Sequence, residues 1–306
     1  MNEPITTSAH TPLGAWSRLL RNRVAIVAML VLAGIVLLAI AGPWLFHYDP
    51  ETTTAAKTQA PSGGHWFGTD LNGRDLFSRV IQGARISLIV GLCGALVSFF
   101  IGTTYGLIAG YAGGRVDNAM MRFVEVLHSI PRLIIVIVAI FTFAPMLETA
   151  LNVAAKPLVG YTKVLILIVC LGLIEWLSMA RIVRGQVLAL KEQQFVLAAR
   201  ALGQSHTRIL LRHLLPNLLG VIIVYLTLTI PAVILDESFL SFLGLGINDP
   251  QASWGSLLSD GKNVINPVRS FWWLLLFPAA AMSLTLVALN FLGDAIRDAL
   301  DPRARR

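Results

Sequence analysis

Six apolar blocks dominate the chain, and each is long enough to cross the hydrocarbon core of a membrane, which takes about 17 to 25 helical residues. They occupy residues 24–46, 86–111, 130–147, 164–180, 218–235 and 271–292. Because lipid offers the backbone no hydrogen-bond partners, each block is predicted to be a helix. We therefore expect an all-α integral membrane protein with six transmembrane helices.

Charge sets the expected orientation. Only 13% of the residues are charged and 56% are hydrophobic, whereas soluble domains carry about 25% charged residues. With a cytoplasmic N-terminus, twice as many of the 24 lysines and arginines, Arg132 among them, fall on the inner side as on the outer side. Both termini are therefore predicted to be cytoplasmic. Topology and lipid headgroups explain the net charge of +7 better than nucleic acid does.

The connecting segments divide the chain unevenly. The expected order is a cytoplasmic tail at 1–23, a retained first transmembrane helix at 24–46, an external loop at 47–85, a five-helix core at 86–298 and a cytoplasmic tail at 299–306. The core includes a cytoplasmic segment at 182–217 and an external loop at 238–270. In the first external loop one helical face would carry Leu76, Phe77, Val80, Ile81 and Ala84. This pattern is typical of an interfacial helix, and an ordinary linker is an equal alternative.

Small residues recur at every fourth position of the second block. They are Gly94, Ser98, Gly102, Gly106 and Gly110. Small residues at this spacing let another helix approach closely in a membrane. The stripe therefore predicts a helix-packing surface inside the bundle.

Glu175 is the clearest ionisable residue at membrane depth, because it lies within the fourth block. A charge there costs several kcal/mol unless it faces protein or water. It either lines a polar pathway or pairs with a residue of a neighbouring helix or subunit. Asp236 and Glu237 lie at the outer end of the fifth block and are expected at the interface.

No catalytic constellation is visible in the sequence. The chain lacks the Walker phosphate-binding motif and the H-E-x-x-H zinc motif, and its six histidines are scattered. Cys93 and Cys170 both lie in apolar blocks, which excludes a disulfide framework. We expect no catalytic residue, no cofactor and no metal site.

A basic, helix-forming stretch separates the fourth and fifth blocks. Phe195, Ala198, Ala199 and Leu202 fall on one apolar helical face. Gly203 suits a helix end, and a second helix is expected to stop at Pro216, just before the fifth block. The pattern predicts a helix, a turn and another helix outside the membrane, with an apolar face suited to a cleft in another protein.

This stretch resembles the cytoplasmic signature of the membrane subunits of ATP-binding-cassette importers. The signature reads Glu-Ala-Ala, then Gly, then Ile-x-Leu-Pro, and here Leu197 replaces its Glu and His213 replaces its Ile. The resemblance implies that this coupling segment docks into an ATPase. The implied docking residues are Phe195, Leu197, Ala198, Ala199, Arg200, Gly203 and Pro216.

The likeness extends over roughly residues 20–303. Stretches such as FGTDLNGRDLFSRVIQGARISLIVG, GLIAGYAGGRVDNAMMR and ESFLSFLGLGINDPQASWGSLLSDG look like the C-type permease of dipeptide and oligopeptide importers. The resemblance implies a type I importer fold in the inner membrane of a prokaryote and three kinds of partner: a B-type permease, ATPases, and an external substrate-binding protein. Residues 67–85 and 238–261 are the implied contacts for that binding protein.

Two other classes remain as alternatives. A self-sufficient secondary transporter or channel would use Glu175 in an ion path, and it would favour internal repeats and further mid-membrane charges. An intramembrane enzyme would need a nucleophile and a base within the spans, and no plausible pair is visible. The sequence therefore favours a permease subunit energised by separate ATPases.

Overall fold

The computed structural model describes residues 15–45, 49–264 and 269–300. The expected tails at 1–23 and 299–306 therefore fall partly outside the described residues. Within these ranges the chain is helical and forms no strand beyond an isolated bridge between Thr69 and Asp75. The all-α class predicted from the apolar blocks is confirmed.

The helices follow one another along the chain, with a long connection between α2 and α3. Their bounds are α1 Ala15–Leu19, α2 Arg23–Leu45, α3 Leu76–Ala112, α4 Gly114–Ser129, α5 Arg132–Ala154, the 3-10 turn η1 Lys156–Tyr161, α6 Thr162–Leu190, α7 Gln194–Ala201, α8 His206–Arg208, the π-helical turn η2 Ile209–Leu214, α9 Leu215–Phe242, α10 Trp254–Asn263 and α11 Trp273–Leu300. Among the described residues, six helical stretches are long and apolar enough to span a membrane.

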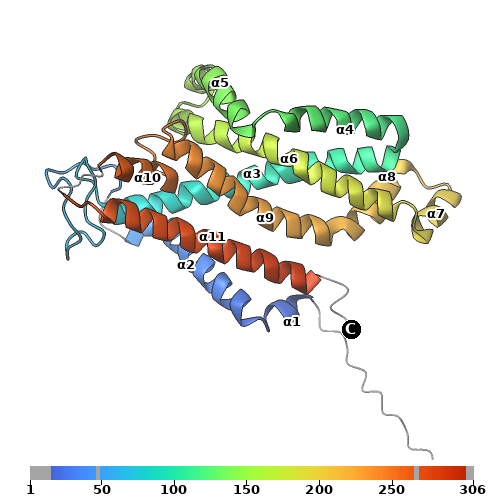
Figure 1. Ribbon diagram of the computed structural model, residues 1–306, viewed down its shortest axis with the longest axis horizontal. Helices are drawn as coiled ribbons and strands as arrows, with labels where there is room; N and C mark the ends of the chain where they lie inside the picture. The colour runs from blue at the N-terminus through green and yellow to red at the C-terminus, as the bar shows by residue number, and fades with distance from the viewer. Residues whose placement is uncertain (1–14, 46–48, 265–268, 301–306) are drawn as a thin grey trace, which may run out of the picture.

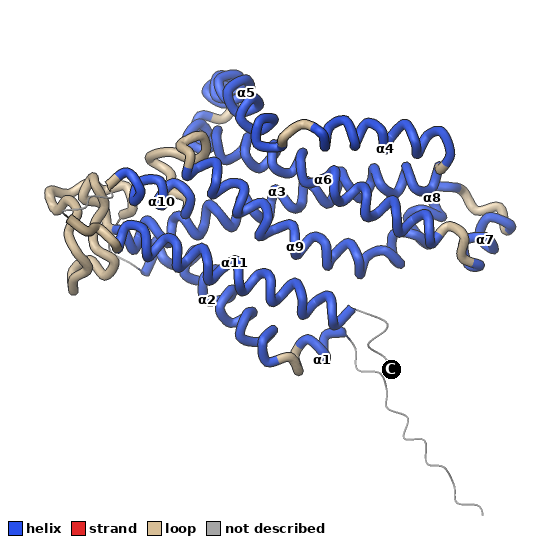
Figure 2. The backbone as a smooth tube through the Cα atoms, in the orientation of Figure 1, coloured by secondary structure: helices blue, strands red, loops and turns tan. Residues whose placement is uncertain are grey.

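The bundle is elongated, with α3, α6 and α9 at its centre (Figures 1 and 2). Helices α2 and α11 lie on one side, and α4 and α5 lie on the other. Half of the most apolar window of α3 and of α6 is buried, against 11% for α5. One end of the bundle carries α7 and the opposite end carries α10, and we call them the α7 end and the α10 end.

The small-residue stripe brings α3 against α6. A Cβ atom on Gly102 would lie 2.6 Å from Cβ of Met179, and one on Gly106 would lie 2.5 Å from the carbonyl oxygen of Ala180. Gly110 meets α6 in the same way further along. A larger residue at these positions would force the two helices apart.

The stripe reaches a second helix at its other end. A Cβ atom on Gly94 would lie 2.9 Å from the side chain of Val233 in α9. Ser98 is completely buried, and its hydroxyl group has no hydrogen-bond partner in the described part of the chain. The small side chains of α3 therefore contact both other central helices.

The loop at 47–85 was expected to contain an interfacial helix, and this prediction is wrong. Residues 76–85 are the first turns of the long α3, which begins where the Asp75 side chain accepts a hydrogen bond of 2.9 Å from the backbone N–H of Ser78. Leu76, Val80 and Ala84 pack in a buried cluster with residues of α9, α10 and α11. The apolar face at the start of α3 is covered by protein, so it does not lie on a lipid surface.

The third apolar block also differs from its expected form. Helix α4 leaves the end of α3 and turns back along the bundle, and α5 begins at Arg132 after two extended residues, Ile130 and Pro131. Proline disfavours helical backbone in the residue before it, which accounts for the break.

Candidate functional site

Helix α7 projects beyond the spans at one end of the bundle (Figure 1). It ends in a Schellman motif, in which the N–H of Gly203 donates to Arg200 and the N–H of Gln204 donates to Ala199, at 2.9 and 3.1 Å. Gly203 has a φ of +71°, a conformation that costs glycine little. Residues 182–190 of the expected segment 182–217 belong to α6, so the projecting part is shorter than expected.

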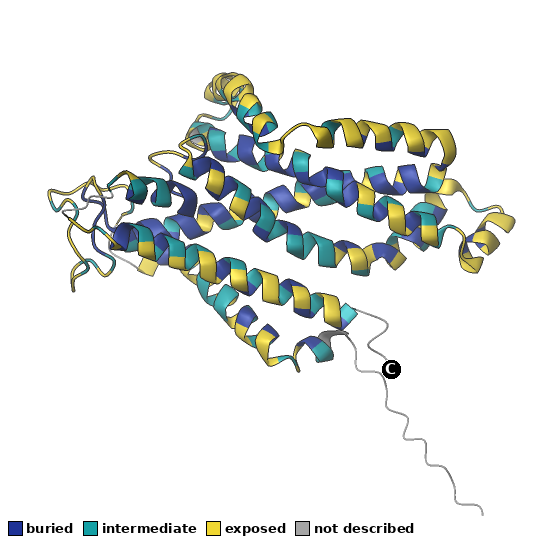
Figure 3. Cartoon of the chain, in the orientation of Figure 1, coloured by how far each residue is buried: buried dark blue, intermediate teal, exposed yellow. Residues whose placement is uncertain are grey.

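One side of α7 is attached to the bundle, and the opposite side is exposed. Val196 and Ala199 are buried in a cluster with residues of α6, η2 and α9. Phe195, Leu197 and Leu202 are 40%, 47% and 80% exposed. Figure 3 shows the exposed surface of α7 at the tip of the molecule.

Of the predicted apolar face, then, Ala199 packs inward, whereas Phe195, Ala198 and Leu202 face outward. Two large apolar side chains on α7, those of Phe195 and Leu197, and that of Leu202 directly after it form a patch that the described residues do not cover.

A link that the sequence did not reveal ties the coupling segment to α3. The Arg200 guanidinium lies 4.9 Å from the ring centre of Tyr111, near the end of α3. The Tyr111 hydroxyl is 2.8 Å from Nδ1 of His206. Arg200 is thus held by its own chain, and both sides of the turn contact the same tyrosine.

The second helix of the coupling segment does not stop at Pro216. The chain stays helical from His206 to Phe242, and the π-helical turn η2 ends at Leu214, two residues before the proline. Proline clashes with the carbonyl four residues earlier, and the wider turn relieves this clash. His213, which replaces the signature Ile, lies with its Nε2 2.8 Å from Oε1 of Gln204 and so holds the turn.

Glu175 lies near the middle of α6 and forms an ion pair. Its Oε1 is 3.2 Å from Nη1 of Arg132, and Oδ2 of Asp236 is 3.4 Å from the same nitrogen. The sequence predicts Arg132 in an inner segment and Asp236 at the outer interface. The break before α5 places Arg132 beside α6 and α9, which brings together three charged residues from three helices.

Glu237 also departs from its expected interfacial place. Its side chain is fully buried and accepts hydrogen bonds from Ser87, Ser238 and Ser241, at 3.2, 3.3 and 2.7 Å. These contacts join α9 to α3. Buried carboxyl groups need such partners, and serines here supply them.

The two segments expected to meet a binding protein lie together at the α10 end. Asp249 accepts two hydrogen bonds from Arg74, at 3.0 and 3.2 Å, and one of 3.0 Å from Arg79. Arg79 is 1% exposed, whereas the Asp249 side chain is 54% exposed. Burial, and secondarily the charge of Asp249, raise the pKa of Asp260 to about 6.

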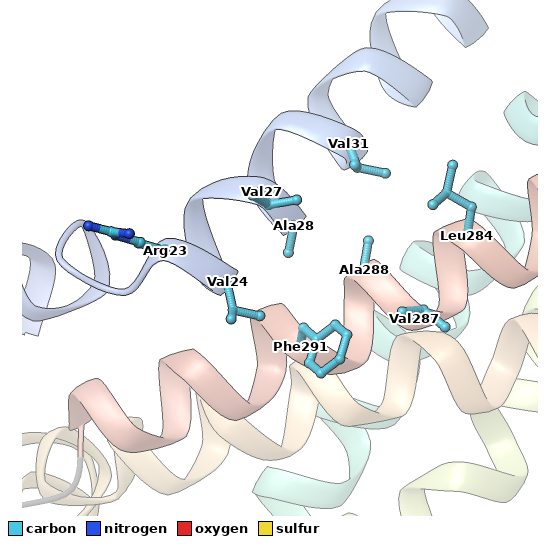
Figure 4. A pocket seen from close by; sticks show the side chains of 9 residues that line it. All are labelled: Arg23, Val24, Val27, Ala28, Val31, Leu284, Val287, Ala288 and Phe291. Atoms are coloured by element: carbon cyan, nitrogen blue, oxygen red, sulfur yellow. The ribbon is translucent and has the colours of Figure 1, made fainter.

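Two cavities differ sharply in chemistry. The one between α2 and α11, of about 320 Å³, is almost wholly apolar (Figure 4), with Arg23, Val24, Val27, Ala28, Val31, Leu284, Val287, Ala288 and Phe291 around it. The other, of about 280 Å³, lies at the break between α4 and α5 and contains Arg132, Glu175 and Ser178. Only the second offers charged and hydroxyl groups from several helices to a polar solute.

Comparison with known proteins gives matches along the chain. Residues 102–306 match the family described as binding-protein-dependent transport system inner membrane component. Residues 13–61 match the N-terminal transmembrane domain of oligopeptide transport permease C. The first match alone covers more than half of the chain.

Similar proteins cover nearly the whole chain. The dipeptide transport system permease protein DppC of Bacillus subtilis is 46% identical over 95% of this chain and 86% of its own length. The oligopeptide transport system permease protein OppC of Escherichia coli is 46% identical over 94% and 90%. OppC of Haemophilus influenzae is 44% identical over 94% and 87%.

A solved structure has a similar fold. It is an inward-facing conformation of the MetNI methionine ABC transporter, and the match covers 74% of this chain and 98% of that one, with a TM-score of 0.54 and 18% sequence identity. At this identity the likeness concerns the fold alone.

Proposed function

The chain belongs to the family of binding-protein-dependent transport system inner membrane components, and from this premise we propose that it is the C-type permease subunit of an importer of peptides. It is a multi-pass protein of the inner membrane. The names of its similar proteins, which are dipeptide and oligopeptide permeases, support peptides as the transported solute. Its role is transport, with both termini and α7 in the cytoplasm, and ATP is hydrolysed by separate subunits.

The observation that carries the proposal is the uncovered apolar patch on α7. Phe195, Leu197 and Leu202 are exposed on a helix whose other side is anchored in the bundle. An amphipathic helix of this kind suits a hydrophobic groove on a partner, and for this family the partner is an ATPase. Ala198 and Arg200 are exposed on the same helix, Ala199 lies on its inner side, and Pro216 lies at the start of α9.

Motion of α7 would reach the spans through contacts on both sides of its turn. Val196 packs with residues of α6 and α9, and Arg200 lies over Tyr111 of α3. A docked ATPase that binds one arrangement of α7 more tightly than another therefore biases all three central helices. ATP-driven closure of the ATPases then favours an outward-open pathway between this chain and a B-type permease.

The α10 end is proposed to receive the substrate-binding protein. The segments at 67–85 and 238–261 meet there through Arg74, Arg79 and Asp249. Asp249 is the exposed member of this group, so it is available to a partner as well as to its own arginines. A single rigid surface made from two segments suits a docking partner better than two independent loops.

A pull-down in mild detergent tests the docking proposal. Leu202→Asp places a charge on the exposed patch without touching the buried side of α7, and the ATPases are expected to be lost while the second permease still co-purifies. Leu71→Asp is the matched control, because Leu71 is also an exposed leucine but lies before α3, at the α10 end and far along the chain from the coupling segment. The control is expected to retain both partners.

Retention of the ATPases by Leu202→Asp would contradict docking through α7. Ala199→Asp is unsuitable for the same test, because Ala199 is buried and a charge there would disturb the chain itself. Recovery of the wild-type chain alone, with solute uptake that needs no ATPase, would contradict the importer proposal as a whole.

A further inference from the structure

The break between α4 and α5 creates an exposed helix start beside α6. Ile130 and Pro131 are extended, with ψ angles of 130° and 117°, and α5 begins anew at Arg132. No side chain caps this N-terminus. The first backbone N–H groups of a helix lack intrahelical partners and carry a partial positive charge, so an uncapped start favours an anion.

Arg132 adds a full positive charge at the same place. Its Nη1 is held by Glu175 and Asp236, but Nη2 and Nε have no hydrogen-bond or ion-pair partner among residues 15–45, 49–264 and 269–300. The side chain is 57% exposed. A guanidinium that faces lipid within the membrane has a large free-energy cost. We therefore expect its free edge to face water or a partner subunit.

The cavity beside this edge is polar and small. Its polar side chains are His128, Ser129, Arg132, Glu175 and Ser178, and its volume is about 280 Å³. Pockets for whole small ligands are larger, about 300–1,000 Å³. The cavity therefore fits one end group of a solute better than an entire peptide.

We infer that Arg132 and the uncapped start of α5 bind the C-terminal carboxylate of the transported peptide. The inference rests on the proposed function. A guanidinium presents paired donors that match a carboxylate, and broken membrane helices elsewhere direct their half-helix N-termini at anionic substrate groups. Glu175 and Asp236 act as positioning residues, because they fix one nitrogen of the guanidinium and leave the other edge free.

The charges in the cluster also set how strong this binding is. Glu175 and Asp236 together outweigh the single charge of Arg132, so the site attracts a carboxylate through its local donors and repels it through the more distant acids. Transport needs a site that a solute both enters and leaves. The geometry points to such a weak, reversible contact.

The test compares a peptide with a free C-terminal carboxylate and the same peptide as its C-terminal amide. Wild-type and variant importers, assembled with both permeases, ATPases and binding protein, are reconstituted in vesicles, and kcat/KM of uptake is measured for each peptide. Arg132→Gln is expected to lower the ratio of acid to amide uptake about tenfold, which corresponds to about 1.4 kcal/mol. The binding protein is the same throughout, so its own preference cancels from the comparison.

Two further variants distinguish the loss of a carboxylate site from a general effect of removing one positive charge. Arg132→Gln leaves Glu175 and Asp236 unpaired, so the triple variant Arg132→Gln, Glu175→Gln, Asp236→Asn removes all three charges and is expected to lower the ratio equally. Arg21→Gln is the matched control, because Arg21 is an exposed arginine between α1 and α2 and lies outside this cavity. It is expected to leave the ratio unchanged.

Three outcomes would overturn the inference. If Arg132→Gln lowered acid and amide uptake equally, Arg132 would have a structural role and the peptide-importer proposal would stand. A triple variant that folded and kept the wild-type ratio would also exclude a carboxylate site at Arg132. If the wild-type assembly took up neither peptide, the proposed function itself would fail, and the inference with it.

Discussion

At the scale of single residues, Asp260 has the clearest pH dependence outside the spans. It lies in α10, 3.7 Å from Nη2 of Arg79, and burial followed by the charge of Asp249 raises its pKa from 3.8 to about 6. The native state therefore binds its proton more tightly than the unfolded state does. The charged carboxylate destabilises the native state above pH 6, and this effect fades as the pH falls toward 4.

Asp260→Asn should remove that destabilisation. The side chain is 41% exposed, so solvent screening reduces the effect to about 1 kcal/mol, or a rise in Tm of roughly 2–4 °C at pH 8. The measurement is thermal unfolding of the purified chain in detergent at pH 8 and pH 4.5, where the difference should shrink. A variant that is less stable than wild type at pH 8 would show that the pairing with Arg79 outweighs the cost of burial.

At the scale of secondary-structure elements, two adjacent residues of α7 lie on opposite sides of the helix, one buried and one exposed. Val196 is completely buried and anchors the helix, whereas Phe195 is 40% exposed. Val196→Ala removes two buried carbon atoms, which costs about 1.5 kcal/mol, and should increase hydrogen exchange across residues 194–201. Phe195→Ala should leave exchange unchanged in the isolated chain and weaken ATPase binding in a pull-down.

The reverse pattern would contradict this division of α7. If Phe195→Ala raised exchange in the isolated chain, the outer side of the helix would be packed against the bundle. If Val196→Ala had no effect on exchange, the buried cluster would not hold the helix in place.

The sequence predicts those features of the helices that depend only on neighbouring residues. Block length and hydrophobicity are local, so the six spans were predictable, and the spacing of Gly102 and Gly106 marked one face of α3. The choice of α6 as the partner helix was not predictable, because it depends on the whole bundle. Val196 was missed because a helix as short as α7 has apolar residues on both sides, and nothing local says which side is covered.

The ion pair of Glu175 shows the same limit. One of the two roles left open for it was pairing with a neighbouring helix, but its partner, Arg132, was assigned to a connecting segment. The break in the helix at Ile130 and Pro131 brings that arginine beside Glu175 of α6. Pro131, at the start of the third apolar block, indicated that the helix would break there. The sequence did not indicate that this break brings Arg132 beside Glu175.

At the scale of the whole molecule, the two outer sides of the bundle differ in chemistry. The side of α2 and α11 presents an apolar groove (Figure 4), which suits lipid chains. On the other side, α4 presents charged residues, including Arg122 and Glu125, which line a polar cavity of about 470 Å³ together with residues of α6. Because exposed charges are costly in lipid, the second side is expected to face the other permease and the pathway.

Spin labels at matched positions test this assignment. Val126 of α4 and Val27 of α2 are 62% and 60% exposed, so cysteines at either site should accept a nitroxide after Cys93 and Cys170 are replaced by alanine. Assembly with the second permease should sharply lower the accessibility of the label at 126 to dissolved oxygen and leave the label at 27 unchanged, because only the first becomes covered. Loss of accessibility at 27 instead would place the partner on α2 and α11, and the charged side of α4 would then have to be covered by other means.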